Sequence, residues 1–467
     1  MRSSSGRLSW AARAALGLAA GSAAAIAGEA PVGQVVDGVS CQSDPTKSYA
    51  LYLPTSYAPQ RPWPALLVFD PGGRGVVALE VFREAAESYG WVVLSSNDTR
   101  NGALVVDNLR AVDAMWRDLG TRYSVDRQRV YAAGFSAGAM LAWSVGQQPG
   151  VFAGIIASGG RLIPEYFAKA PSYAHFGAAG MDDFNFQGMR KVDQLLAGFG
   201  TLHRLEFFEG QHTWMPPELA REAVEWLELD AMRRSLRPRD ESLIAVLYDK
   251  DAGKARGLET AGKLFPAWRR WRAVGDAFAA LRDVAEAQAA VQRLAATDAV
   301  RDGVKDEERS ERMEEEHLGY LFEALARVRE GSQPLTTGRL ASDLRISELE
   351  RLAEEDSWKG VTARRLQQTF VAYTGNIVPR ELIGDKRYKD AALLVTVAER
   401  IRPDSAALAY NHACFLALAG ERKEAFGSLT RAIDLGFSDR ALLEKDSDLD
   451  NLRADERFSA LLARLPS

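Results

Sequence analysis

The strongest constraint on this chain is the sequence Gly-Phe-Ser-Ala-Gly at 134–138, which lies between a β-prone apolar run at 130–133 and a helix-prone run at 139–143. A serine on a sharp strand-to-helix turn has a strained backbone and crowded neighbours, so its flanking positions carry little or no side chain. The helix that follows directs its first N–H groups towards the place where an oxyanion would form. The pattern predicts a nucleophile elbow with Ser136 at its tip.

The length of 467 residues is too great for one ordinary core, so we expect more than one domain. Hydrophobic residues make up 47% of the chain, charged residues make up 26%, and the formal net charge is −5. This mild acidity gives no reason to expect a nucleic-acid partner. The two cysteines, Cys41 and Cys414, exclude a disulfide framework, and the sequence shows no zinc-like Cys/His cluster.

Residues 1–27 have the pattern of a signal peptide. A basic start with Arg2, Arg7 and Arg13 precedes an uncharged alanine- and leucine-rich run at 14–27, which closes on a small-x-small cleavage signature. The run is too short and too rich in alanine for a convincing membrane span. The sequence predicts export, either periplasmic or secreted, with no membrane span after signal removal; the alternatives are an uncleaved anchor or a disordered tail.

Residues 31–232 alternate short apolar runs with amphipathic stretches, which is typical of βαβ units and a parallel sheet. Besides the run before the elbow, the expected strands are 49–53, 65–69, 91–95, 154–158, 173–177 and 204–208. The expected helices are 76–89, 105–119, 189–199 and 218–232. The predicted class is α/β, with a mostly parallel sheet flanked by helices as in the α/β-hydrolase fold, followed by an all-α domain.

The basic, proline-containing segment 233–240 is predicted to be a linker, because the alternation of predicted strands and helices ends there. Beyond it, residues 241–366 show only helical periodicity. The densely charged stretch 301–316 is most simply a solvated helix face or a loop.

An internal repeat occurs near the end of the chain. Ala391, Val395, Ala398 and Pro403 recur 34 positions later as Ala425, Leu429, Ala432 and Phe437. A helical hairpin of this length resembles a tetratricopeptide repeat, although Ala409 and Leu416 stand where that family has tryptophan and tyrosine. Residues 367–467 are predicted to be such repeats with a C-terminal cap, which bind a protein partner or only pack against the rest of the chain.

A serine nucleophile needs a base within hydrogen-bond reach and a third group that orients the base. In α/β-hydrolases these partners follow in the order Ser, Asp/Glu, His. Only three histidines lie between Ser136 and the predicted linker. His175 lies inside an apolar run and is expected in the core, and His203 precedes a strand. His212 follows the strand at 204–208 in a loop, and we predict that it is the base.

The orienting acid is expected after the preceding strand, where Asp182 and Asp183 are adjacent. Only one of them can point at His212. Asp183 is favoured because Gly-x-x-Asp, counted from Gly180, is the usual local spacing in these enzymes, and Asp182 is the alternative acid. The other carboxylate is then a helix N-cap or a solvated loop charge.

The oxyanion donors are expected from the backbone. One is the N–H of Ala137, directly after the nucleophile. The other is expected from the loop that begins at Asp70, with Gly72 as first choice and Gly73 as second. Asp70 could brace this loop. Arg74 could neutralise an acidic group of the substrate or be a plain surface arginine.

Three motifs carry a resemblance to a known family: Tyr-x-Leu-Tyr-Leu-Pro at 49–54, Gly-Phe-Ser-Ala-Gly-Ala at 134–139 and Glu-Gly-Gln-His-Thr-Trp at 209–214. Together they resemble the secreted esterase group that contains polyhydroxybutyrate depolymerases and feruloyl esterases, over residues 31–232. The chain departs from this group at Asp-Pro (70–71), where the more familiar start of the oxyanion loop is His-Gly.

The resemblance implies ester cleavage through an acyl-serine intermediate, without a metal or an organic cofactor. It implies Ser136 as nucleophile, Asp183 as acid and His212 as base. We therefore expect an exported serine carboxylesterase that acts on a small-molecule or oligomeric ester. The alternatives are a serine peptidase, since the same triad cleaves amides, or an inert hydrolase domain in an interaction protein with tetratricopeptide-like repeats.

Overall fold

The computed structural model describes residues 30–331 and 335–466, so the predicted signal at 1–27 lies outside the described residues. Contacts divide the chain into two compact units. The first runs to Met181 and from Asn185 to Gly303, and the second comprises Asp182–Phe184 and the chain from Val304 onwards. Nowhere in the described ranges does a helix combine the length and the apolar character needed to cross a membrane.

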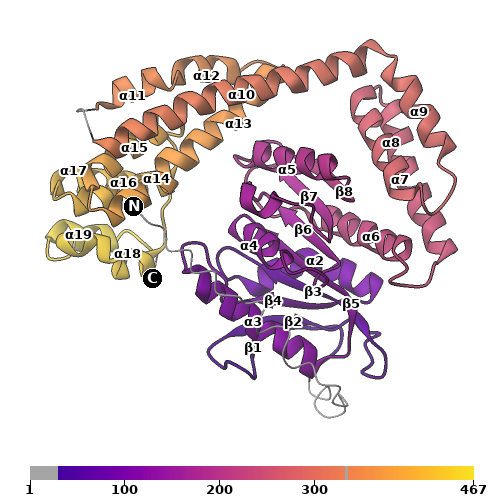
Figure 1. The fold of residues 1–467 in the computed structure, drawn as a ribbon. Coiled ribbons are helices and arrows are strands. Elements are labelled where there is room, and N and C mark those ends of the chain that lie inside the picture. Colours follow the sequence, from indigo (N-terminus) through magenta and orange to yellow (C-terminus); the bar gives the residue numbers. More distant parts are fainter. Residues whose placement is uncertain (1–29, 332–334, 467) are drawn as a thin grey trace. The chain divides into compact units, whose positions relative to one another are not determined.

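The first unit is built on one eight-stranded sheet with the order β1-β2-β4-β3-β5-β6-β7-β8 (Figure 1). Its strands are β1 (Val35–Ser40), β2 (Ser48–Tyr52), β3 (Trp63–Phe69), β4 (Val92–Ser96), β5 (Val125–Phe135), β6 (Gly154–Ser158), β7 (Ala174–Gly180) and β8 (His203–Phe208). β2 pairs antiparallel with β1 and β4, whereas neighbours from β4 to β8 pair in parallel. This is the arrangement of the α/β-hydrolase fold, so the predicted fold class is confirmed.

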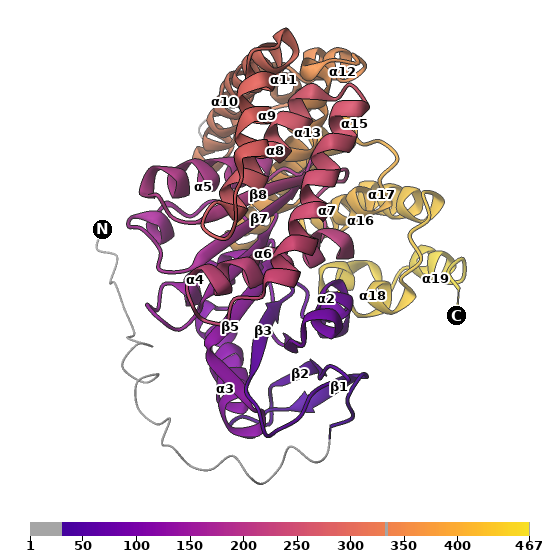
Figure 2. The ribbon, with the colours of Figure 1, turned by 90° about the vertical axis from the view of Figure 1, so that its right-hand side faces the viewer.

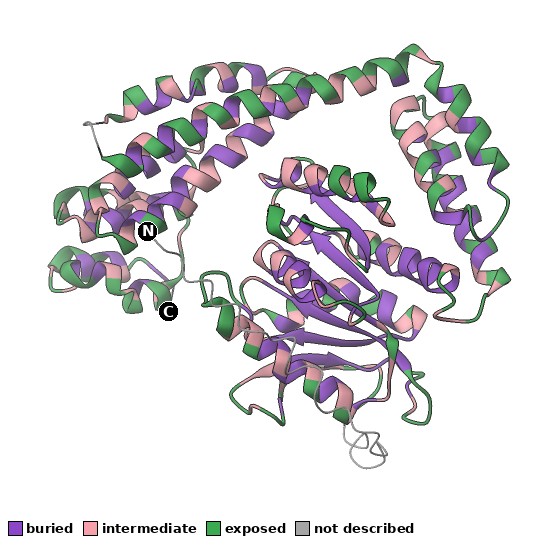
Figure 3. Ribbon diagram, viewed as in Figure 1, coloured by how far each residue is buried: buried purple, intermediate pink, exposed green. Residues whose placement is uncertain are grey.

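Helices cover both faces of the sheet. They are α2 (Gly75–Tyr89) and α6 (Pro217–Arg233) on one face, and α3 (Val105–Arg122), α4 (Ala137–Gly146) and α5 (Phe186–Phe199) on the other. Alternate residues of β3 point to opposite faces: Leu66 and Val68 pack with α2, and Leu67 packs with α3. Figure 2 shows α2 and α3 on opposite sides of the strands, and Figure 3 shows the central strands buried. A continuous apolar run such as β3 is therefore stable only between two helical layers.

The first unit extends beyond the predicted boundary at 232. Helices α7 (Glu241–Thr260), α8 (Leu264–Phe278) and α9 (Ala285–Ala295) share the core of the α2/α6 face. The predicted linker 233–240 joins α6 to α7 inside this unit. The reason lies in α6, whose residues 223–232 are all buried. A helix that is buried all round needs a second layer of helices outside it.

A buried ion network joins this second layer to the sheet. Arg270 on α8 lies 2.8 Å from Glu222 on α6 and 2.7 Å from Asp251 on α7. Arg204 on β8 lies 2.7 Å from Glu206 and 3.3 Å from Asp251. Burial alone would raise the pKa of Glu222, but Arg270, Lys254 and Arg204 lower it to about 2. The Glu222 carboxylate is therefore held in its charged form.

The second unit is helical. Its elements are α10 (Asp298–Glu330, which begins in the first unit), α11 (Thr337–Asp343), α12 (Ile346–Ala353), α13 (Trp358–Ala372), the π-helix η2 (Tyr373–Ile377), α14 (Val378–Gly384), α15 (Tyr388–Ile401), α16 (Ala406–Leu418), α17 (Arg422–Asp434), α18 (Arg440–Lys445), the 3₁₀ helix η3 (Ser447–Leu452) and α19 (Glu456–Leu462). Six of the eight recurring positions of the repeat lie on α15 and α17, while Pro403 and Phe437 follow these helices. The six side chains on the helices are fully buried: Ala391, Val395, Ala398, Ala425, Leu429 and Ala432. The tetratricopeptide assignment itself stays a prediction.

The charged stretch 301–316 lies within α10, so the helix interpretation holds and the loop interpretation does not. One side of it is not solvated. Glu314 and Ser310 are buried, and Arg365 of α13 forms hydrogen bonds with both. Charge density alone does not separate a solvated helix face from one that carries a buried ion pair.

Candidate active site

Ser136 stands at the corner between β5 and α4, with φ 55° and ψ −117°. A positive φ is strained for a residue other than glycine and persists only where the surroundings hold it. Here the Ser136 N–H donates to the Ser158 carbonyl at 2.9 Å, and its own carbonyl accepts from the Ala139 N–H at 3.0 Å. These bonds fix the serine above the carboxyl end of the sheet.

The two glycines of the elbow are required by close backbone contacts. A Cβ on Gly134 would lie 2.1 Å from the carbonyl oxygen of Gly138. A Cβ on Gly138 would lie 1.9 Å from the carbonyl oxygen of Phe69 at the end of β3. Neither position has room for a side chain, which is the physical reason for the Gly-x-Ser-x-Gly spacing.

His212 lies in the loop after β8, and its Nε2 is 2.8 Å from the Ser136 hydroxyl oxygen. Phe135 packs beside the imidazole with ring centroids 4.6 Å apart. The loop becomes buried two residues after His212, at Trp214 and Met215. There the Met215 N–H donates to the Ser158 hydroxyl at 3.2 Å. The structure thus brings together the predicted nucleophile and the predicted base.

Asp182 and Asp183 follow β7. Asp183 is fully buried and Asp182 is half-buried. Their loop leaves β7 beside the loop that carries His212. The backbones are so close there that a Cβ on Gly180 would lie 2.4 Å from the carbonyl oxygens of residues 210 and 211. Which of the two carboxylates orients His212 stays a prediction.

The predicted oxyanion donors differ in what their N–H groups do. Ala137 is the first residue of α4, where helix geometry provides no acceptor within the helix. The Gly72 N–H donates to the Asp70 carboxylate at 2.8 Å, and the Gly73 N–H donates to the Asp70 carbonyl at 3.2 Å. Both glycine N–H groups are therefore engaged by the loop itself, and Asp70 braces this loop as expected from the sequence.

The other two candidate histidines lie outside this pair. His175 is buried in β7, where its Nε2 accepts a hydrogen bond from the Trp143 indole at 3.0 Å. Burial lowers the pKa of His175 to about 3, with a smaller contribution from His203. Nδ1 of His203 lies 2.7 Å from the Thr201 carbonyl oxygen. The expected core role of His175 agrees with these contacts.

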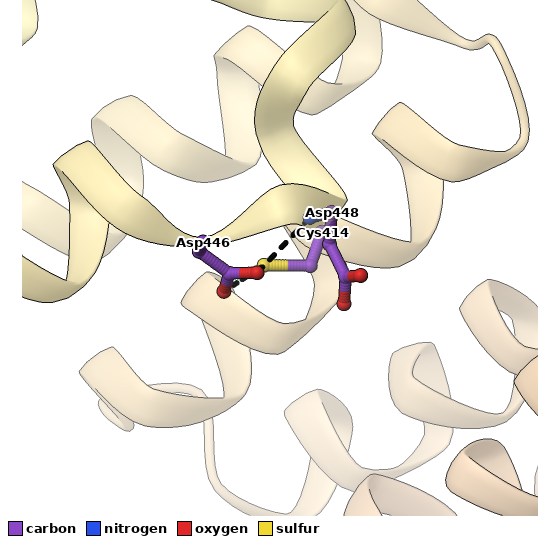
Figure 4. A group of neighbouring side chains, drawn as sticks. All are labelled: Cys414, Asp446 and Asp448. Carbon is purple, nitrogen blue, oxygen red and sulfur yellow. Dashed lines mark hydrogen bonds between the residues drawn. The ribbon is translucent and has the colours of Figure 1, made fainter.

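One further group of side chains has the composition of a metal site. Within the described residues, ligand atoms of Cys414, Asp446 and Asp448 lie within 4.8 Å of one another (Figure 4). Both oxygens of Asp446 already accept hydrogen bonds, from the Tyr410 hydroxyl at 2.8 Å and from the Asp448 N–H at 3.0 Å. Burial and Asp446 raise the pKa of the Cys414 thiol, and it is the thiolate that binds metals. These contacts describe a capped helix end rather than a ligand set.

Fold and site together define a chain of the α/β-hydrolase fold with a serine–histidine pair at its elbow. No family model and no curated protein matches the sequence. Among solved structures, the chain is similar to native esterase 2 of the planctomycete Thermogutta terrifontis, with a TM-score of 0.35 and 18% identity over 44% of this chain and 92% of that one. The chain is equally similar to the same esterase phosphorylated by paraoxon, with a TM-score of 0.35 and 18% identity over 44% of this chain and 96% of that one.

Proposed function

We propose that this protein is a serine hydrolase that cleaves carboxylic esters through an acyl-serine intermediate. The observation that carries the proposal is the 2.8 Å separation between Nε2 of His212 and the hydroxyl of Ser136 at a strained strand–helix corner. A serine–base contact of this length is the requirement for activating an alcohol at neutral pH.

In the first half of the reaction, the Ser136 oxygen attacks the ester carbonyl while Nε2 of His212 takes the hydroxyl proton. The tetrahedral intermediate collapses, the ester C–O bond breaks, and the imidazolium gives its proton to the leaving alcohol. In the second half, His212 takes a proton from water, hydroxide attacks the acyl-serine, and the acid leaves as Ser136 regains its proton.

Two groups would support this sequence. The N–H of Ala137 would donate to the oxyanion, since it is directed outward at the start of α4. Asp183 would hold the imidazole in the tautomer that accepts at Nε2, with Asp182 as the alternative. Gly72 could contribute a second oxyanion donor only by releasing or sharing its bond to Asp70.

The test is hydrolysis of p-nitrophenyl acetate and of a peptide p-nitroanilide by the full chain and by Ser136→Ala. We expect ester turnover by the wild type, little cleavage of the anilide, and a loss of about 10⁴-fold or more in kcat for the variant. Ser144→Ala, on the same helix, is the matched control and should keep wild-type turnover. Preferential cleavage of the anilide would indicate a peptidase, and no turnover of either substrate would leave an inert domain.

A further inference from the structure

Asp70, directly after β3, is fully buried, and its carboxylate accepts hydrogen bonds from five donors. One oxygen accepts from the Gly72 N–H at 2.8 Å, from Nε of Arg74 at 2.9 Å and from the Arg74 backbone N–H at 3.4 Å. The other accepts from Nη2 of Arg74 at 2.9 Å and from the indole N–H of Trp214 at 2.8 Å. Burial alone would raise the pKa of Asp70, but the bonds from Arg74, Trp214 and Gly72 keep it below its ordinary value. The carboxylate is therefore charged and fixed in place.

These donors come from two separate loops. Gly72 and Arg74 lie between β3 and α2, in the predicted oxyanion loop. Trp214 lies 144 residues after Asp70, in the loop that carries His212. A single carboxylate thus ties the loop expected to meet the oxyanion to the loop that supplies the base.

The indole of Trp214 also packs against Phe135, and the Phe135 ring packs in turn against His212 of the Ser136–His212 pair. Its centroid lies 5.7 Å from that of Phe135, which in turn lies 4.6 Å from the imidazole of His212. Phe135 is the residue directly before Ser136. A displacement of the indole would therefore disturb both the base and the backbone of the elbow.

We propose that Asp70 is a positioning residue, which holds Trp214 and through it keeps His212 at hydrogen-bond distance from Ser136. This inference rests on the proposed function. Asp70 acts through its neighbours and does not itself exchange a proton with the substrate, because all its accepting directions are already used by protein donors.

The first test is Trp214→Phe, which removes the indole N–H and keeps an aromatic ring beside Phe135. We expect kcat for p-nitrophenyl acetate to fall about tenfold or more with KM changed less than about twofold, because the loss lies in geometry and not in substrate binding. The matched control is Trp91→Phe, since the Trp91 indole likewise donates to a buried carboxylate, Glu228, at 2.6 Å. Trp91 precedes β4, at the opposite end of the parallel strands from Ser136, so its loss should leave kcat close to that of the wild type.

A second variant, Asp70→Ala, removes the oxygen that accepts from the Trp214 indole and decides the question if Trp214→Phe does not fold. We expect it to lower kcat about tenfold or more. The double variant should be no more than about threefold worse than Asp70→Ala alone, because the indole has already lost its acceptor.

The outcomes separate the two proposals. If the wild-type protein does not hydrolyse the ester, the proposed function fails. If the wild type is active and Trp214→Phe loses no more kcat than Trp91→Phe, the positioning role is overturned. Losses that multiply in the double variant would also overturn it, since they would show that Asp70 and Trp214 act independently.

Discussion

The α-carbon of Gly138 faces the carbonyl oxygen of Phe69 so closely that a methyl group at this position would lie 1.9 Å from that oxygen. β3 and the nucleophile helix are thus in direct backbone contact. We expect Gly138→Ala to lower the free energy of unfolding by about 3 kcal/mol or more, because backbone on both sides must shift. Urea titration followed by circular dichroism measures this change.

The control for that substitution is Gly253→Ala, at an exposed position in the middle of α7. No atom lies within 4 Å of where its Cβ would be, so this change should be neutral or stabilise the protein by up to about 1 kcal/mol. Equal stabilities for the two variants would contradict the close contact at the elbow.

The buried imidazole of His175 predicts a specific dependence of stability on pH. Its pKa is lowered to about 3 in the folded protein from an ordinary value of 6.5, so protonation favours the unfolded chain in this interval. Stability due to the neutral form is fully present above pH 6.5 and is lost as the pH falls towards 3. Between pH 7 and pH 5 the wild type should lose about 2 kcal/mol more unfolding free energy than His175→Gln. Parallel losses in the two proteins would show that His175 does not titrate in this way.

We predict that the ion network around Arg270 stabilises the packing of the outer helices α7–α9 on the rest of the first unit. Arg270→Met should cost about 3–5 kcal/mol of stability, because it leaves Glu222 and Asp251 buried beside one cation fewer. Arg256→Met, which breaks an exposed pair with Glu286 at 2.7 Å, should cost less than about 1 kcal/mol. Thermal unfolding of both variants measures the difference, and a cost for Arg270→Met as small as that for Arg256→Met would argue against the network.

The fold could be predicted in large part because its strands are apolar runs between clear turns. β3, β4, β6, β7 and β8 lie within a few residues of the expected ranges. β1 was not predicted, because its residues are half-buried or exposed and show no clean alternation. Its place at the sheet edge explains that composition.

The unit boundary could not be predicted from a composition change. Segment 233–240 is basic and contains a proline, yet it is only the turn between α6 and α7. Residues 223–232 of α6 are all buried, but Glu225, Glu228 and Asp230 are among them, so the sequence of this helix looks amphipathic and does not reveal the helices that cover it from outside.

In the site, Ser136 and His212 were accessible to sequence reasoning because turn geometry and chain order restrict both. The link from Asp70 to Trp214 was not, since it joins residues 144 positions apart and depends on where two loops meet. The bond from the Gly72 N–H to Asp70 is different, because it joins residues only two positions apart and a bracing role for Asp70 could be expected from the sequence. An Asp in place of the usual His at the start of this loop was the one visible sign.

The most direct test of the account is the site of covalent labelling by a fluorophosphonate, located by peptide mass spectrometry on the intact, folded chain. We predict one adduct per molecule, on the peptide that contains Ser136, with labelling slowed at least about 100-fold in His212→Gln because the base is lost. An unlabelled wild-type protein, or an adduct that persists in Ser136→Ala, would contradict the central claim that His212 activates Ser136.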